Sequence, residues 1–138
     1  MIILDTNVFS EAMKNNPNVM VHNWLNSQVA ETLYITSVTL AELLMGIAVM
    51  PKGKRKNALE LTLDELLRLF KTRILPFDEG AARHYAQQVV LARNAGRACS
   101  VPDAYIAGIA AAHGFIVASR DTGPYEAAGV NVINPWIP

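Results

Sequence analysis

Two carboxylates follow apolar runs of the kind that form buried strands. Asp5 comes directly after the run at residues 1–4, and Asp121 comes three residues after the end of the run at 115–118. In open parallel sheets, ligands and chemistry gather just beyond the carboxyl ends of the strands. A buried carboxylate is unfavourable unless a positive charge lies beside it. These two positions therefore predict a cation site at one edge of a sheet.

Two further acids belong to helices that would begin at the same edge. Asp103 lies in the first turn of one predicted helix, and Glu42 lies in the early turns of another. Helices that follow parallel strands start at the edge where those strands end, so we expect all four acids to converge. Carboxylates packed together repel one another, which raises their pKa values, and a divalent cation removes that repulsion.

Taken alone, each acid has an ordinary structural explanation. Asp5 could cap the next helix, Asp103 would be favoured by the helix dipole, and Asp121 would be a turn residue. Glu42 is harder to explain in this way because apolar residues surround it in the sequence. Four such acids at one edge favour a shared site over coincidence.

The available ligands favour a hard divalent cation. Oxygen ligands select Mg²⁺ or Mn²⁺ over zinc, and no histidine or cysteine cluster competes for a metal. The single Cys99 excludes a disulfide framework, and we interpret it and the three scattered histidines as structural residues. Such an ion keeps waters, binds phosphate oxygens and can activate a water for attack on phosphorus. We therefore expect phosphodiester hydrolysis without a covalent intermediate.

Hydroxyl and amide side chains next to the acids could orient carboxylates, waters or a phosphate. The candidates for this supporting role are Thr6, Asn7, Ser119 and Thr122.

The elements that position these residues alternate between strand and helix. Short apolar runs predict strands at residues 1–4, 33–35, 73–77, 115–118 and 130–133. Helical spacing of apolar residues predicts helices at 9–13, 19–26, 38–50, 59–70, 79–95 and 101–114, with Thr36 or Ser37 as a cap before the third. Strands separated by helices predict an α/β fold, a three-layer α/β/α sandwich with a mostly parallel central sheet, in a single domain over residues 1–138.

Composition and charge narrow the classes of protein further. Half of the chain is apolar and 17% is charged, which argues against disorder. The uncharged stretch at 104–119 is shorter than a membrane span and the N-terminus lacks a basic flank, so we expect a cytoplasmic protein. Ten of the twelve basic residues lie at positions 52–97, against five acidic ones. The basic run at 52–56 either contacts an RNA backbone or is an exposed start of a helix.

Four motifs in order along the chain resemble the PIN domain, a family of metal-dependent ribonucleases. They are Asp-Thr-Asn at residues 5–7, Ala-Glu-Leu at 41–43, Asp-Ala-Tyr-Ile-Ala at 103–107 and Arg-Asp at 120–121. The chain is most similar to VapC-type toxins of the FitB-like branch, which the segments at 73–78 and 118–136 support. The resemblance covers nearly all of the chain.

This resemblance implies a function and a set of partners. The chain would be the toxin of a type II toxin–antitoxin system and an endoribonuclease that depends on Mg²⁺ or Mn²⁺. The catalytic and metal-binding residues would be Asp5, Glu42, Asp103 and Asp121, with Asp5 and Asp103 as direct ligands. The partners would be an RNA substrate, a second copy in a homodimer, and a small DNA-binding antitoxin whose tail occupies the toxin's groove.

Other functions agree less well with the sequence. Asp-Thr-Gly at 121–123 resembles an aspartic protease turn, but Arg120 precedes it and the α/β pattern is wrong for that class. A haloacid-type phosphatase would have a second aspartate where Asn7 stands. A degenerate PIN module that only binds a partner or DNA stays open, although intact acids at all four positions argue against it.

Overall fold

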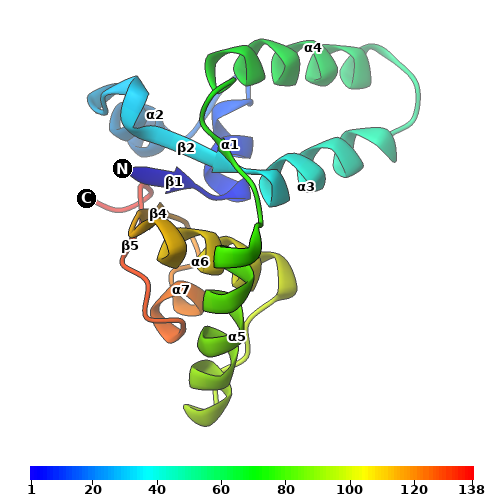
Figure 1. Ribbon diagram of the computed structural model, residues 1–138. Coiled ribbons are helices and arrows are strands. Elements are labelled where there is room, and N and C mark those ends of the chain that lie inside the picture. The colour runs from blue at the N-terminus through cyan, green and yellow to red at the C-terminus, as the bar shows by residue number, and fades with distance from the viewer.

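The computed structural model describes residues 1–138 and places a five-stranded sheet between two groups of helices (Figure 1). All the strands are parallel, in the order β3-β2-β1-β4-β5. Their bounds are β1 (Ile2–Leu4), β2 (Leu33–Thr36), β3 (Ile74–Leu75), β4 (Ile116–Ala118) and β5 (Val132–Ile133). Each lies within or beside one of the predicted apolar runs, so the predicted α/β/α sandwich with a parallel sheet is confirmed.

The helices form one layer on each face of the sheet (Figure 1). One layer contains α1 (Thr6–Ala12), α2 (Val19–Ser27), α3 (Ser37–Ala48) and α4 (Lys54–Leu69). The other contains α5 (Glu79–Asn94), α6 (Val101–His113) and α7 (Gly123–Ala127). The six predicted helices are present, whereas α7 and a short 3₁₀ turn at Ala30–Thr32 are not predicted by the sequence pattern. The turn expected at 121–123 continues into a short helix, because Pro124 in the first turn of α7 favours helical backbone.

Two apolar cores lie on opposite faces of the sheet because alternate residues of β1 point to opposite sides. Leu4 packs in the core beneath α1–α4, together with Phe9 and Val21. Ile3 packs in the core beneath α5–α7, together with Tyr125. No helix of the chain is both long and apolar enough to span a bilayer.

Side-chain caps fix where the helices that carry site residues begin. Thr36 Oγ1 accepts the Thr39 N–H at 3.1 Å and starts α3, as its position after the second strand predicts. Ser100 Oγ accepts the Asp103 N–H at 3.4 Å and starts α6. These caps set the position of Glu42 along α3 and of Asp103 in the first turn of α6.

The order of the strands places a topological switch point at the end of β1. The chain leaves β1 toward β2 on one side, while β4 pairs with β1 on the other, so the direction of winding reverses between β1 and β4. Ligand sites of open α/β sheets lie at this kind of switch point. Asp5 follows β1 and Ser119 follows β4, so both lie at this switch point.

Candidate functional site

Asp5 is a buried carboxylate at the end of β1. Its side chain is the N-cap of α1, where Oδ1 accepts the Val8 N–H at 3.1 Å, and the residue is 3% exposed. The pKa of Asp5 is raised from 3.8 to about 6, chiefly by burial and also by the negative charge of Asp103, whereas the backbone hydrogen bond from Val8 lowers it. Asp5 is therefore both a helix cap and a carboxylate that is poorly stabilised when it is ionised.

No cationic side chain pairs with any of the four acids. The two ion pairs of the chain are Lys14–Glu11 at 3.0 Å and Arg83–Glu79 at 3.6 Å, both within single segments. Arg120, which precedes Asp121 in the sequence, instead lies over the Trp136 ring, 5.3 Å from its centroid. The positive charge that a buried carboxylate requires does not come from the protein.

Asp103 contacts a tyrosine hydroxyl in the core. The side chain of Tyr125 is fully buried, and its hydroxyl donates to Oδ1 of Asp103 at 3.4 Å. Burial and the charges of Asp5 and Asp103 raise the pKa of Tyr125, so the phenol stays neutral and remains a donor. Tyr125 thus lies beside both acids. It is not among the predicted site residues, although its position four residues after Asp121 indicated that it could lie near the acids.

Glu42 is held by two threonines. The Thr6 hydroxyl donates to Glu42 Oε1 at 2.6 Å, and Thr6 Oγ1 lies 3.1 Å from Thr39 Oγ1. Because Thr6 has a single hydroxyl proton, Thr39 must be the donor to Thr6. Thr39 is not among the predicted site residues either, although it precedes Glu42 by three positions on α3 and so shares its helix face.

Asp121 lies in an exposed turn that Ser119 closes. The buried Ser119 hydroxyl donates to the Asp121 carbonyl oxygen at 3.0 Å and accepts the Asp121 N–H at 3.1 Å. Cys99 is half-buried nearby, and burial, followed by the charges of Asp103 and Asp121, raises the pKa of its thiol. Of the four predicted supporting residues, Thr6 and Ser119 make side-chain hydrogen bonds at the site, and Asn7 and Thr122 make none.

The four acids surround one end of the sheet without closing on a common point. Asp5 and Asp103 are close enough to interact electrostatically, and Cys99 is close enough to interact with Asp103 and Asp121. Glu42 is linked to this group through its hydrogen bond from Thr6, the residue after Asp5. No group of three or more histidine, cysteine, aspartate or glutamate side chains is close enough to hold a metal ion. Repulsion between the carboxylates opposes closer approach until a cation neutralises them.

The donor set nevertheless fits a hard divalent cation. All four candidate ligands are carboxylates, which Mg²⁺ and Mn²⁺ prefer. The raised pKa of Asp5 and the lack of a cationic partner are what a cation would relieve. The joint role of the four acids as one site stays a prediction.

The PIN domain family model matches residues 2–130 of the chain. The chain is 52% identical over 137 residues to the plasmid stability protein StbB of Pseudomonas syringae pv. tomato, and the match covers 99% of each protein. It is 48% identical over 139 residues to the VapC ribonuclease Y4jK of Sinorhizobium fredii, with 100% of this chain and 99% of the relative covered. It is 47% identical over 137 residues to toxin FitB of Neisseria gonorrhoeae, with 99% of each covered.

Solved structures show the same fold. The chain superposes on FitAcB from Neisseria gonorrhoeae with a TM-score of 0.93 and 47% identity, over 99% of each chain. It superposes on FitAB bound to an IR36 DNA fragment with a TM-score of 0.94 and 46% identity, over 99% of this chain and 96% of the other.

Proposed function

Because this chain belongs to the PIN domain family, we propose that it is the toxin of a toxin–antitoxin pair and acts as a divalent-metal-dependent endoribonuclease. The observation that carries the proposal is Asp5, a carboxylate 3% exposed whose pKa is raised to about 6 and which has no cationic side chain beside it. The names of two relatives, a VapC ribonuclease and a toxin, support the activity and the role.

Asp5 and Asp103 are the proposed direct ligands of the ion, with Glu42 and Asp121 completing the acidic site. A Mg²⁺ or Mn²⁺ ion held there would stabilise charge on the phosphate and lower the pKa of a water. Such an ion would lower the pKa of Asp5 and so relieve the cost of its buried charge at neutral pH.

Neighbouring residues keep the acids in position. Thr6 occupies Oε1 of Glu42, which leaves Oε2 to accept a hydrogen bond from the attacking water. Tyr125 fixes the rotation of the Asp103 carboxylate through Oδ1. Asp121 is exposed at the mouth of the site, where it can accept a proton from that water or orient it.

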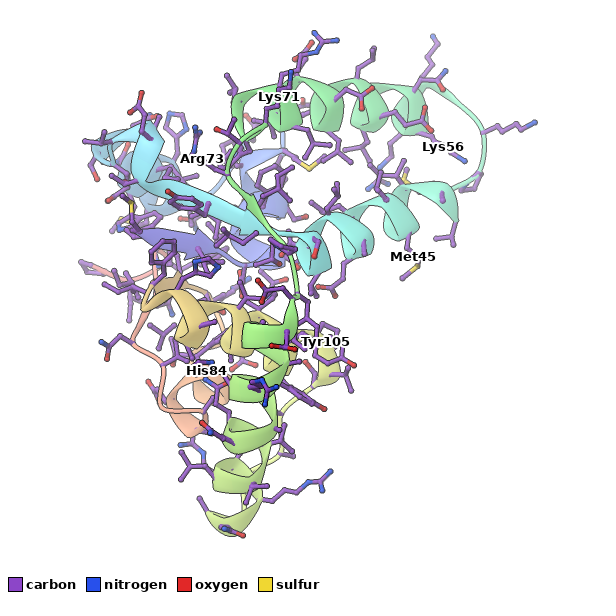
Figure 2. All side chains as sticks on the ribbon, in the orientation of Figure 1. Met45, Lys56, Lys71, Arg73, His84 and Tyr105 are labelled. Atoms are coloured by element: carbon purple, nitrogen blue, oxygen red, sulfur yellow. The ribbon has the colours of Figure 1, made fainter.

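The RNA would enter along a groove beside Glu42. A cavity of about 430 Å³ opens there between α1, α3 and the start of α4, and its lining includes Glu42, Lys14 and Arg55. Two residues of the basic run at 52–56 have different roles. Arg55 lines the groove. Lys56 donates to the carbonyl oxygens of Ala48 and Met50 at 3.2 and 3.4 Å and so caps the end of α3 (Figure 2). Arg55 is the residue of the run that we expect to contact a phosphate.

The proposed antitoxin would cover the outer face of α3. Met45 and Val49 are exposed apolar residues there, and Met45, which also lines the groove beside Glu42, points away from α4 (Figure 2). An exposed apolar surface of this kind favours a protein partner. The similar structures FitAcB and FitAB, the second of them bound to DNA, support a small DNA-binding antitoxin as that partner. We also expect a homodimer, which light scattering of the purified toxin would detect.

Induced expression tests the function in cells. We expect wild-type protein to arrest growth and Asp103→Asn to remove the arrest, because the substitution removes a ligand charge and keeps the size of the side chain. Asp64→Asn is the matched control, since Asp64 is an exposed acid on α4. Equal arrest by wild type and Asp103→Asn would favour the alternative function, a PIN module that acts only by binding a partner or DNA.

A further inference from the structure

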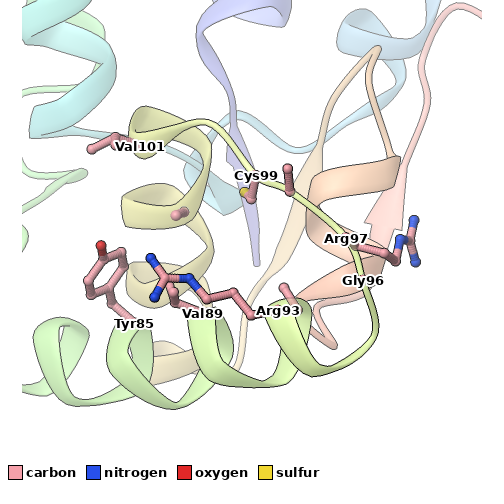
Figure 3. Close-up of a pocket in the computed structure, with 10 residues that line it drawn as sticks. Tyr85, Val89, Arg93, Gly96, Arg97, Cys99 and Val101 are labelled. Carbon is pink, nitrogen blue, oxygen red and sulfur yellow. The ribbon is translucent and has the colours of Figure 1, made fainter.

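A second cavity lies between the end of α5 and the start of α6 (Figure 3). Its volume is about 450 Å³, within the range of small-ligand sites. The walls are mostly apolar, and the residues that matter for its chemistry are Tyr85, Arg93, Arg97, Cys99 and Val101. None of these residues is a proposed metal ligand or a hydrogen-bond partner of one.

The cavity adjoins the acidic site. Val101 precedes Asp103 by two positions on α6, and the thiol of Cys99 lies close enough to Asp103 and Asp121 to interact with their negative charges. Arg97 Nη2 donates to the carbonyl oxygen of Gly123 at 3.1 Å, two residues beyond Asp121. A Cβ atom on Gly123 would lie 3.7 Å from both Arg97 Nη2 and Asp121 Oδ1, so the guanidinium reaches the edge of the acidic site.

Neither arginine of the cavity forms an ion pair with a carboxylate, and both are exposed. Arg93 extends along α5 toward Tyr85, whereas Arg97 points the other way, toward α7 (Figure 3). A guanidinium can stack on a planar base and can bind a phosphate through two parallel hydrogen bonds. The two arginines therefore offer cationic donors on two sides of an apolar cavity.

We propose that this cavity holds one nucleotide of a single-stranded RNA next to the bond that is cut, an inference that rests on the proposed ribonuclease function. Arg97 binds the phosphate nearest the acids, and the base enters the apolar part of the cavity under Arg93. Unpaired bases are held in proteins by aromatic and arginine side chains together with basic grooves. An acidic peptide fits less well because it has no flat apolar group for the cavity.

Binding of a fluorescently labelled single-stranded RNA in EDTA, followed by anisotropy, tests the proposal without cleavage. We expect Arg93→Gln with Arg97→Gln to weaken binding about tenfold or more, and to reduce the slope of log affinity against log salt by about 0.7 for each phosphate that the variant no longer neutralises. We expect Ala98→Trp, which fills the cavity from an exposed loop position, to weaken binding without changing that slope. Arg83→Gln is the control, since Arg83 lies on α5 outside the cavity and pairs with Glu79.

The cavity proposal is overturned if RNA does not bind, or if the double variant and Ala98→Trp bind RNA as the control does. It is also overturned if loss of the two arginines weakens binding of a labelled poly-glutamate peptide and leaves RNA binding unchanged, because the cavity would then be a peptide site. Cleavage of the same RNA by wild type with Mn²⁺ is measured separately. Arginine-dependent binding without cleavage would contradict the ribonuclease function alone, and cleavage with arginine-independent binding would contradict the cavity alone.

Discussion

The Thr6 hydroxyl donates to Oε1 of Glu42 at 2.6 Å, which joins the start of α1 to the second turn of α3. Asp5 and Thr6 are adjacent in the chain, so one residue provides a proposed metal ligand and the next holds a second acid in place. Thr39 extends this contact into a chain of two hydrogen bonds. The motif Asp-Thr-Asn at 5–7 therefore has a structural reason for a hydroxyl at its second position.

Removing the Thr6 hydroxyl should lower activity while the fold is kept. We expect Thr6→Val to reduce the rate of RNA cleavage about 10- to 100-fold, in the range for partners that orient metal ligands, because Glu42 loses its donor. Thr6→Ser should restore most of the rate, since the hydroxyl returns. The control is Thr62→Val on α4, whose hydroxyl bonds to the Ala58 carbonyl oxygen and lies outside the site. Equal rates for Thr6→Val and Thr62→Val would contradict the role of Thr6.

The Tyr125 hydroxyl should matter for metal binding more than for folding. Tyr125→Phe keeps the buried ring and removes the 3.4 Å hydrogen bond to Asp103. We expect the dissociation constant for Mn²⁺, measured by calorimetry, to rise about tenfold, because Asp103 loses the group that orients it. An unchanged constant in a folded variant would show that the contact does not position Asp103.

Asp5 should make the metal-free protein less stable as the pH rises. Its pKa is higher in the folded chain, about 6, than the ordinary value of 3.8, so the folded state binds the proton more tightly. Stability is therefore lost as the pH rises from about 4 through about 6, by at most about 3 kcal/mol. Asp5→Asn keeps a capping side chain and has no charge, so its unfolding free energy in EDTA should lack this loss. If the unfolding free energy changed between pH 4 and pH 7.5 by the same amount in wild type and in Asp5→Asn, the raised pKa of Asp5 would be contradicted.

Two glycines should respond in opposite ways to a methyl group. A Cβ on Gly108 would lie 2.7 Å from the Ala81 carbonyl oxygen, where α5 and α6 meet, so Gly108→Ala should lower the melting temperature. Gly46 lies inside α3 with no atom within 4 Å of such a Cβ, so Gly46→Ala should stabilise the fold by about 0.5–1 kcal/mol. Thermal melts of the two variants check this, and a stabilising Gly108→Ala would contradict the close helix contact.

The parts of the fold that local sequence patterns determine were predictable. Apolar runs located all five strands, and Thr36 was recognisable as a cap because a hydroxyl residue follows a strand and precedes helical spacing. The helix α7 was not predictable in this way because Gly123 and Pro124 are also turn residues, and the burial of Tyr125 in the core, which favours the helix over a turn, is not visible in the local sequence.

The candidate acids could be selected from the sequence, whereas only some of their hydrogen-bond partners could. Asp5 and Asp121 were identifiable because each follows a strand. The hydrogen bonds that Thr39 and Tyr125 make join elements far apart in the sequence, so closeness to an acid along the chain did not predict the bonds themselves. The same holds for Arg97, whose contact with Gly123 spans two segments that meet only in the folded chain.

Cleavage of end-labelled cellular RNA by the purified protein tests the central claim most directly. Wild type and Asp5→Asn are compared with Mn²⁺, with Mg²⁺ and with EDTA, and the ends of the products are mapped. We predict defined cuts by wild type with either metal, no cuts in EDTA, and a loss of at least about 100-fold in Asp5→Asn because the buried ligand charge is gone. Cuts by wild type in EDTA, or equal cutting by Asp5→Asn, would contradict a metal-dependent site built on Asp5.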